Sequence, residues 1–259
     1  MEVLPVTPNF AAEIGDVDLS LELSDSIMDD IKSAFWDYSV LVFPNQHLSS
    51  EQHLVFARRI GELEAIANNY RPGPALRVPL QIADVSNLTH DERIWDADSP
   101  RRLHELANRL WHTDSSFKKR SALASLLYAK SIPPTGGHTE FADMRAAYDG
   151  LPATKIASIE NLIAEHCIRY SRARIGFTDF TEEELIALPP VARPIVRTVR
   201  DSGRKTLYLA SHAGKILGMS EEEGERTIDE LLNHATQRQF IYTHRWRQND
   251  LVMWDNRCT

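Results

Sequence analysis

The sequence predicts a mainly β fold with helices, an α+β protein with a β-sandwich or jelly-roll core. Two patterns favour this class: many short strand-like runs are separated by Gly and Pro turns, and the helical segments cluster in the amino-terminal part and in insertions. The chain has 259 residues, which is enough for one large domain with its own hydrophobic core. We therefore expect a single domain over residues 1–259.

The amino-terminal part begins with helices and a buried strand. Residues 25–36 carry apolar side chains at helical spacing, and the SVLVF run of residues 39–43 is typical of a buried strand. Ser49 and Gln52 predict a capping box for a helix that ends at Ile60. These signals indicate helix, strand and helix in that order.

Two polar segments follow. Residues 68–79 are rich in Pro, Gly and Asn, and residues 89–102 are rich in charged side chains, with no clear periodicity in the first. We expect two long loops here, which form a lid over the residues that come next.

The remaining chain alternates strands and helices. Asp201-Ser202-Gly203 predicts the turn of a β-hairpin, and Glu221, Glu222 and Glu223 suit the first turn of a helix. The predicted strands are 122–132, 139–141, 165–170, 195–199, 206–210, 239–244 and 250–254. One predicted helix is capped by Asp143 and ends at Tyr148. The other predicted helices are 151–163, 182–188 and 220–235.

Composition excludes some classes of function. The net charge of −8 argues against a nucleic-acid-binding protein, although a locally basic pocket for an anionic small molecule stays open. No run of about 18 apolar residues is present, so we expect no membrane span. The first residues lack a signal-peptide pattern, and Cys167 and Cys258 give no hint of a disulfide framework. We expect a cytoplasmic protein.

His112 and Asp114 are the first candidate for chemistry. They stand two residues apart, and on an extended strand residues i and i+2 point to the same face. One nitrogen and one oxygen ligand on one strand are most of the two-His-one-carboxylate triad, which leaves open sites on Fe(II). A hydrolase that uses Zn or Mn to activate water is an alternative use of the same pair.

Several blocks resemble one family, and they occur in the family's order along nearly the whole chain. The blocks are Asn108–Phe117, Pro133–Phe141, Asp143–Asp149, His244–Trp246 and Asp250–Arg257. They are similar to the taurine / 2,4-dichlorophenoxyacetate dioxygenase family, and most of all to its aryloxyalkanoate-cleaving branch.

The resemblance implies a double-stranded β-helix (jelly-roll) core with flanking helices, and an enzyme that uses Fe(II), 2-oxoglutarate and O2. His112 and Asp114 would then bind iron, Thr139 would hydrogen-bond the distal carboxylate of 2-oxoglutarate, and Trp254 would wall that pocket. In the family a third histidine ligand and a 2-oxoglutarate-binding arginine follow the Trp-Asp-Asn-Arg block. The sequence stops at Thr259 before both, so we expect it to be truncated and inactive as written.

The implied reaction hydroxylates an aryloxyacetate, such as 2,4-dichlorophenoxyacetate, next to the ether oxygen. The products are a phenol and glyoxylate, with succinate and CO2 from the co-substrate. A sulfonate such as taurine is an alternative substrate, and a non-catalytic jelly-roll binding module is an alternative function. We also expect a homo-oligomer.

Four residues are candidates for contact with an anionic substrate. Asn69 and Arg71 lie in the first long loop, and Arg71 suits a carboxylate because a guanidinium binds it through two hydrogen bonds. Asn108 precedes His112 by one helical turn, and His212 follows a predicted strand. Each has a structural alternative: a solvated loop residue for Arg71, a helix end for Asn108 and a core position for His212.

Overall fold

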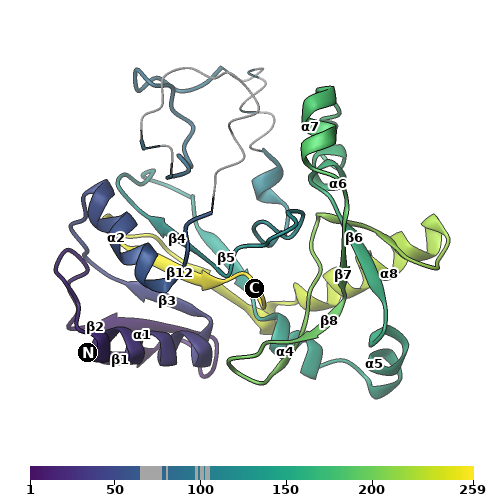
Figure 1. The fold of residues 1–259 in the computed structure, drawn as a ribbon, viewed down its shortest axis with the longest axis horizontal. Helices are drawn as coiled ribbons and strands as arrows, with labels where there is room; N and C mark the ends of the chain where they lie inside the picture. The colour runs from purple at the N-terminus through teal and green to yellow at the C-terminus, as the bar shows by residue number, and fades with distance from the viewer. Residues whose placement is uncertain (65–77, 80, 97–98, 100–101, 103–105) are drawn as a thin grey trace.

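The computed structural model describes residues 1–64, 78–79, 81–96, 99, 102 and 106–259. Most of the first predicted loop, including Asn69 and Arg71, lies outside these residues, as does part of the second, so the predicted lid is not described. Helices and strands are both abundant (Figure 1), whereas the sequence predicted a mainly β fold with helices. Among the described helices, none is long and apolar enough to span a membrane.

A five-stranded sheet forms one half of the molecule. Its strands in spatial order are β1 (Glu2–Pro5), β2 (Ala11–Gly15), β3 (Val40–Phe43), β12 (Leu251–Asp255) and β4 (Ala124–Tyr128). The pair β2–β3 is parallel and the other neighbours are antiparallel. Chain segments from both ends of the sequence therefore meet in one sheet.

The two faces of this sheet are buried differently, because successive side chains of a strand point to opposite faces. Helices α1 (Asp25–Tyr38) and α2 (Ser50–Ile60) cover the face that carries Leu41 and Met253 (Figure 1). The opposite face carries Val42 and Val252, which pack against Phe141. Phe141 belongs to β5 (Thr139–Ala142), which pairs with β11 (Ile241–His244). The pair β5–β11 thus lies over the inner face of the five-stranded sheet.

The other half of the molecule is an α+β layer with its own core. Its strands are β6 (Ile163–His166), β7 (Val191–Pro194) and β10 (Ala213–Ile216) in one sheet and the hairpin β8 (Val196–Thr198) and β9 (Lys205–Leu207). Its helices are α4 (Met144–Asp149), α5 (Ala153–Ile159), α6 (Ile168–Ala173), α7 (Glu182–Ala187) and α8 (Glu221–Ala235). Short 3-10 helices are η2 (Leu106–Arg109) and η3 (Arg238–Phe240). Apolar side chains of α4, α5 and α8 pack on these strands to form the second core.

Local signals explain most element boundaries. Ser49 and Gln52 form the predicted capping box at the start of α2, and the Asp143 side chain caps α4. The hairpin around Gly203 is confirmed, with a φ of +67° at that glycine. The helix predicted over 151–163 is shorter, because β6 already begins at Ile163.

The strand predicted over residues 165–170 is wrong beyond His166. Residues 165–170 were expected to be extended, but β6 ends at His166 and α6 begins at Ile168. Ile168, Ser171 and Arg172 are buried at spacings of three and four residues, which is helical periodicity. The ring of Tyr170 lies against the backbone of Gly214, where a Cβ would come within 2.2 Å of the ring. Glycine in β10 thus makes room for this helix.

Candidate metal and co-substrate site

The segment that carries His112 lies in a loop, so the predicted strand at this point is wrong. Residues 111–113 belong to no strand, and Asp114 begins a turn in which Ser115 has a φ of +60°. Two contacts hold the loop: Ser211 N–H donates to Trp111 O at 2.9 Å, and Thr113 Oγ1 donates to Asn256 O at 2.7 Å. The loop is therefore fastened to both halves of the molecule.

The side chains of His112 and Asp114 nevertheless converge, as the metal hypothesis requires. Nε2 of His112 lies 3.5 Å from Oδ1 of Asp114, and the two side chains keep 29% and 36% of their surface exposed. Nδ1 of His112 lies 2.8 Å from Leu110 O. Since a carbonyl only accepts, Nδ1 carries a proton there, and in the neutral ring Nε2 presents a lone pair. One imidazole nitrogen and one carboxylate oxygen thus face a common, open point.

This donor pair fits a divalent cation. Nitrogen and oxygen ligands each about 2.1 Å from one ion lie roughly 3 Å apart when they meet at right angles, close to the observed separation. Burial lowers the pKa of His112, but the hydrogen bond to Asp114 and its charge outweigh burial and raise that pKa. For Asp114, burial raises the pKa of the carboxyl group, but the contacts with His112 and Ser125 outweigh burial and lower that pKa. Asp114 is an anion that attracts positive charge to this point.

Within the described residues, no third His, Cys, Asp or Glu completes a metal centre with this pair. His244 pairs with buried Asp250, with Nε2 3.2 Å from Oδ2, and its ring packs edge-on against Trp246. It therefore has a structural environment of its own.

His212 lies beside the pair. Its ring centroid is 6.1 Å from that of His112 and 4.8 Å from that of Phe117. Only 3% of His212 is exposed, and burial, followed by the positive charges of His112 and Arg172, holds its pKa well below the ordinary value. His212 is a neutral imidazole at pH 7 and is well placed to donate or accept a hydrogen bond next to the site.

Thr139 and Trp254 come from the two facing sheets. Thr139 and Phe141 share one face of β5, and Phe141 contacts the Trp254 ring at 5.4 Å between centroids. The Thr139 hydroxyl oxygen accepts a hydrogen bond of 3.0 Å from Trp246 Nε1, so its own proton is available to an acceptor. An acidic co-substrate group is such an acceptor.

The remaining candidate residues are less informative. Asn108 is exposed and lies within η2. Asn69 and Arg71 lie outside the described residues.

Two residues of the site escaped the sequence analysis. Ser125 Oγ donates to Asp114 Oδ2 at 2.6 Å, and Asn256 Nδ2 donates to Ser125 Oγ at 2.9 Å. Ser125 is the one polar residue in the ASLLY strand β4, which was the available signal.

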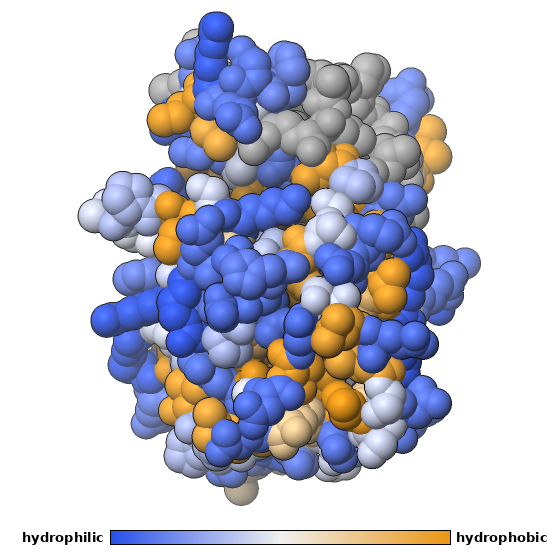
Figure 2. Space-filling model, turned by 90° about the vertical axis from the view of Figure 1, so that its left-hand side faces the viewer, coloured by the Kyte–Doolittle hydropathy of each residue, from blue (hydrophilic) through white to orange (hydrophobic). Residues whose placement is uncertain are grey.

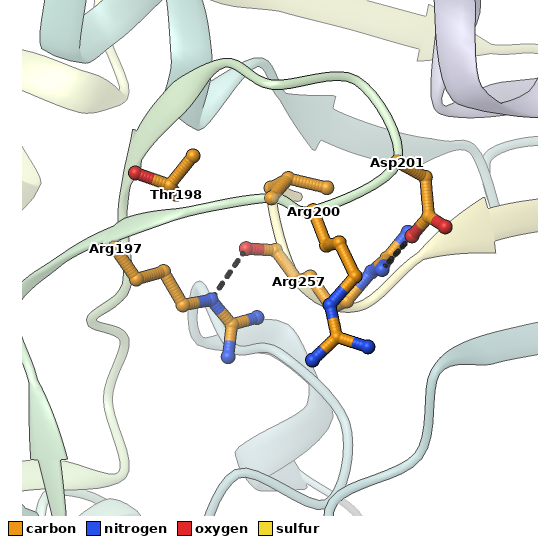
Figure 3. Close-up of a pocket in the computed structure, with 6 residues that line it drawn as sticks. Arg197, Thr198, Arg200, Asp201 and Arg257 are labelled. Atoms are coloured by element: carbon orange, nitrogen blue, oxygen red, sulfur yellow. Dashed lines mark hydrogen bonds and ion pairs between the residues drawn. The ribbon is translucent and has the colours of Figure 1, made fainter.

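A cavity of about 350 Å³ lies between the β8–β9 hairpin and the last turn of the chain (Figure 3). Arg197 Nε donates to Arg257 O at 3.2 Å, and Arg257 is paired with Asp201 and Asp255. Two carboxylates thus offset the charge of Arg257. None of the predicted site residues that the structure describes lines it.

Comparison with known proteins shows the family of the chain. The model of the family described as "Taurine catabolism dioxygenase TauD, TfdA family" matches residues 2–259. An α-ketoglutarate-dependent 2,4-dichlorophenoxyacetate dioxygenase of Cupriavidus pinatubonensis is 44% identical over 254 residues, which are 98% of this chain and 88% of that protein. An (S)-phenoxypropionate/α-ketoglutarate dioxygenase of Sphingobium herbicidovorans is 35% identical, over 99% of this chain and 87% of its own length.

A solved structure points the same way. The crystal structure of AAD-2 in complex with Mn(II) and N-oxalylglycine superposes with a TM-score of 0.93 at 43% identity, and covers 100% of this chain and 89% of that one. The match extends over all the elements that hold His112 and Asp114. The chain belongs to the TauD/TfdA family of dioxygenases.

Proposed function

We propose that this protein is an Fe(II)- and 2-oxoglutarate-dependent dioxygenase that cleaves an aryloxyacetate such as 2,4-dichlorophenoxyacetate. The substrate carbon next to the ether oxygen is hydroxylated, and the product separates into a phenol and glyoxylate. O2 is consumed, and 2-oxoglutarate becomes succinate and CO2. The observation that carries the proposal is the convergence of His112 Nε2 and Asp114 Oδ1 at 3.5 Å in a member of this family.

Each residue has a role in the proposal. His112 and Asp114 bind the metal, which with 2-oxoglutarate supplies the oxidative chemistry. Thr139 donates its hydroxyl proton to the distal carboxylate of 2-oxoglutarate, and Trp254 forms a wall of that pocket. The five-stranded sheet and the β5–β11 pair are the two facing walls of a double-stranded β-helix.

Aromatic surroundings favour an aryl substrate over a sulfonate. Phe117 and His212 form an edge-to-face pair next to the metal ligands, which suits packing against a flat ring. His212 would orient the substrate through a hydrogen bond, and Asn69, Arg71 and Asn108 stay candidates for its carboxylate. The names of the relatives also favour aryloxy acids over taurine.

The proposal is tested by product analysis. Purified protein with its chain extended past Thr259, loaded with Fe(II) without air and then exposed to O2, should release phenol and succinate in equal amounts from 2,4-dichlorophenoxyacetate and 2-oxoglutarate. Taurine in place of the aryloxyacetate should give no sulfite, and Asp114→Ala should give no phenol. Phenol release that does not need 2-oxoglutarate would instead support a metal-dependent hydrolase.

Assembly and location stay predictions from the sequence. A homo-oligomer and a cytoplasmic protein were expected. On the face that carries α2 and β1, apolar side chains lie among hydrophilic ones (Figure 2), and Leu4, Val6 and Val55 are exposed.

A further inference from the structure

A directed chain of hydrogen bonds ends at the metal-facing carboxylate. Asn256 Nδ2 donates to Ser125 Oγ at 2.9 Å, and Ser125 Oγ donates to Asp114 Oδ2 at 2.6 Å. Asp114 as an anion only accepts, so the Ser125 proton must point to it. Ser125 Oγ can then only accept from Asn256, which fixes the orientation of that amide. The chain has one polarity, from amide to hydroxyl to carboxylate.

Asn256 is the fixed end of this chain. Its side chain is buried, with 1% of the residue exposed, and its backbone N–H donates to Leu123 O at 3.0 Å. Its carbonyl accepts from Thr113 Oγ1 at 2.7 Å, so the same residue also holds the loop between His112 and Asp114. Asn256 therefore joins the ends of β4 and β12 to each other and to the loop that carries both candidate metal ligands.

The carboxylate is oriented as a result. Oδ2 of Asp114 is occupied by Ser125, and Oδ1 is the oxygen that faces His112 Nε2. Without the Ser125 hydroxyl, Oδ2 would be free to rotate toward the metal or toward solvent. Hydrogen-bond partners of metal ligands fix ligand orientation, and their loss commonly reduces metal affinity or activity 10–100-fold.

We propose that Ser125 and Asn256 are positioning residues that hold the Asp114 carboxylate in its metal-binding orientation, with Asn256 acting through Ser125. The inference rests on the proposed function, because it requires that His112 and Asp114 bind a divalent metal.

A matched pair of variants isolates the hydroxyl. Thr and Val have nearly the same shape and both suit a strand, so Ser125→Thr keeps the hydroxyl that Ser125→Val removes. Mn(II) affinity of the metal-free protein is measured from the electron paramagnetic resonance signal of unbound Mn(II), which needs no turnover. We expect Ser125→Val to bind Mn(II) about 10–100-fold more weakly and Ser125→Thr to bind close to normally.

Ser116→Ala removes a buried hydroxyl two residues from Asp114, and should leave the affinity for Mn(II) unchanged.

The double variant tests whether Asn256 acts on Asp114 through Ser125. Asn256→Ala should weaken Mn(II) binding on its own but cause no further loss in the Ser125→Val background, because its side chain acts through the missing hydroxyl. Thermal unfolding of each metal-free variant verifies folding, and Ser125→Ala replaces Ser125→Val if the latter does not fold.

The outcomes separate the two proposals. If the unmodified protein binds Mn(II) and the Thr and Val variants bind it equally well, the positioning role is overturned while the dioxygenase proposal stands. If the unmodified protein binds no Mn(II), both are overturned. If the losses of Mn(II) affinity from Asn256→Ala and Ser125→Val are additive, Asn256 does not act through Ser125.

Discussion

At the scale of single residues, Thr139 shows how a hydroxyl becomes available for a ligand. Trp246 Nε1 donates to the hydroxyl oxygen of Thr139. The hydroxyl proton is not used in this hydrogen bond, so it can be donated to a ligand. A carboxylate that accepts this proton gains a charge-assisted hydrogen bond.

We predict that Thr139→Val raises the KM for 2-oxoglutarate about 10-fold or more, since a hydrogen bond to a charged group contributes about 1.5–3 kcal/mol. Steady-state kinetics with 2-oxoglutarate as the varied substrate measure this, and kcat should change less. Thr243→Val on the adjacent strand removes a hydroxyl that bonds Glu140 and Arg238, and serves as the control. An unchanged KM in Thr139→Val would show that this residue does not contact the co-substrate.

Residue types and their spacing pointed to His112 and Asp114 as a candidate metal pair, but not to the residues that support them. The structure brings the two side chains together, although not on a strand as expected: a turn and the contacts to Leu110 and Ser125 place them. Such contacts join residues far apart in the sequence. For that reason Ser125 could not be recognised before the strands were placed.

At the scale of secondary-structure elements, Arg145 joins α4 to the end of α1. Its guanidinium is 1% exposed, and it donates to Asn9 O at 2.9 Å, to Asp37 O at 3.1 Å and to Asp143 Oδ1 at 3.1 Å. Asp143 in turn caps α4, so one buried ion pair supports both helix ends.

We predict that Arg145→Met lowers the free energy of unfolding by about 3–5 kcal/mol, because it leaves Asp143 as a buried charge without its partner. Arg238→Met removes an exposed ion pair with Glu140 and should cost no more than about 1 kcal/mol. Urea unfolding followed by circular dichroism compares the two. If both variants lose a similar free energy of unfolding, burial of the Arg145–Asp143 pair does not explain its contribution.

Element prediction succeeded where the signals were local. Capping residues and helical periodicity located α1, α2, α4, α7 and α8, and turn residues located the β8–β9 hairpin. Strands β1, β2, β7 and β10 were not predicted. Each is four or five residues long, and its pairing depends on partners elsewhere in the chain, such as β2 beside β3. The β11 and β12 segments were predicted, but they join different sheets, and sequence pattern alone could not decide that.

At the scale of the whole molecule, buried histidine links stability to pH. His166 is fully buried and stacks on Tyr208, with ring centroids 5.5 Å apart. Burial, together with the charges of Arg193 and Arg197, lowers its pKa to about 3. In the unfolded chain a histidine has a pKa of about 6.5, so the unfolded state binds the extra proton first as the pH falls.

We predict that stability is lost progressively as the pH falls from about 6.5 towards 3, and that His166→Phe reduces this loss. Between pH 7 and pH 4.5 the variant should lose about 2–3 kcal/mol less than the unmodified protein. Phe keeps the aromatic stacking and cannot take up a proton. Urea unfolding at the two pH values measures the difference, and parallel pH dependence in both proteins would count against a buried neutral His166.

The attachment of the metal pair at Asn256 has a consequence for engineering. The ligands are fastened to the ends of β4 and β12, whereas His212 comes from the segment before β10 in the other half of the molecule. Substitutions of the His212 side chain would alter the proposed substrate pocket and leave the Ser125 and Asn256 contacts of the candidate metal pair in place, as long as the backbone bond from Ser211 to Trp111 is kept. New substrate ranges should then be reachable without rebuilding the candidate metal site.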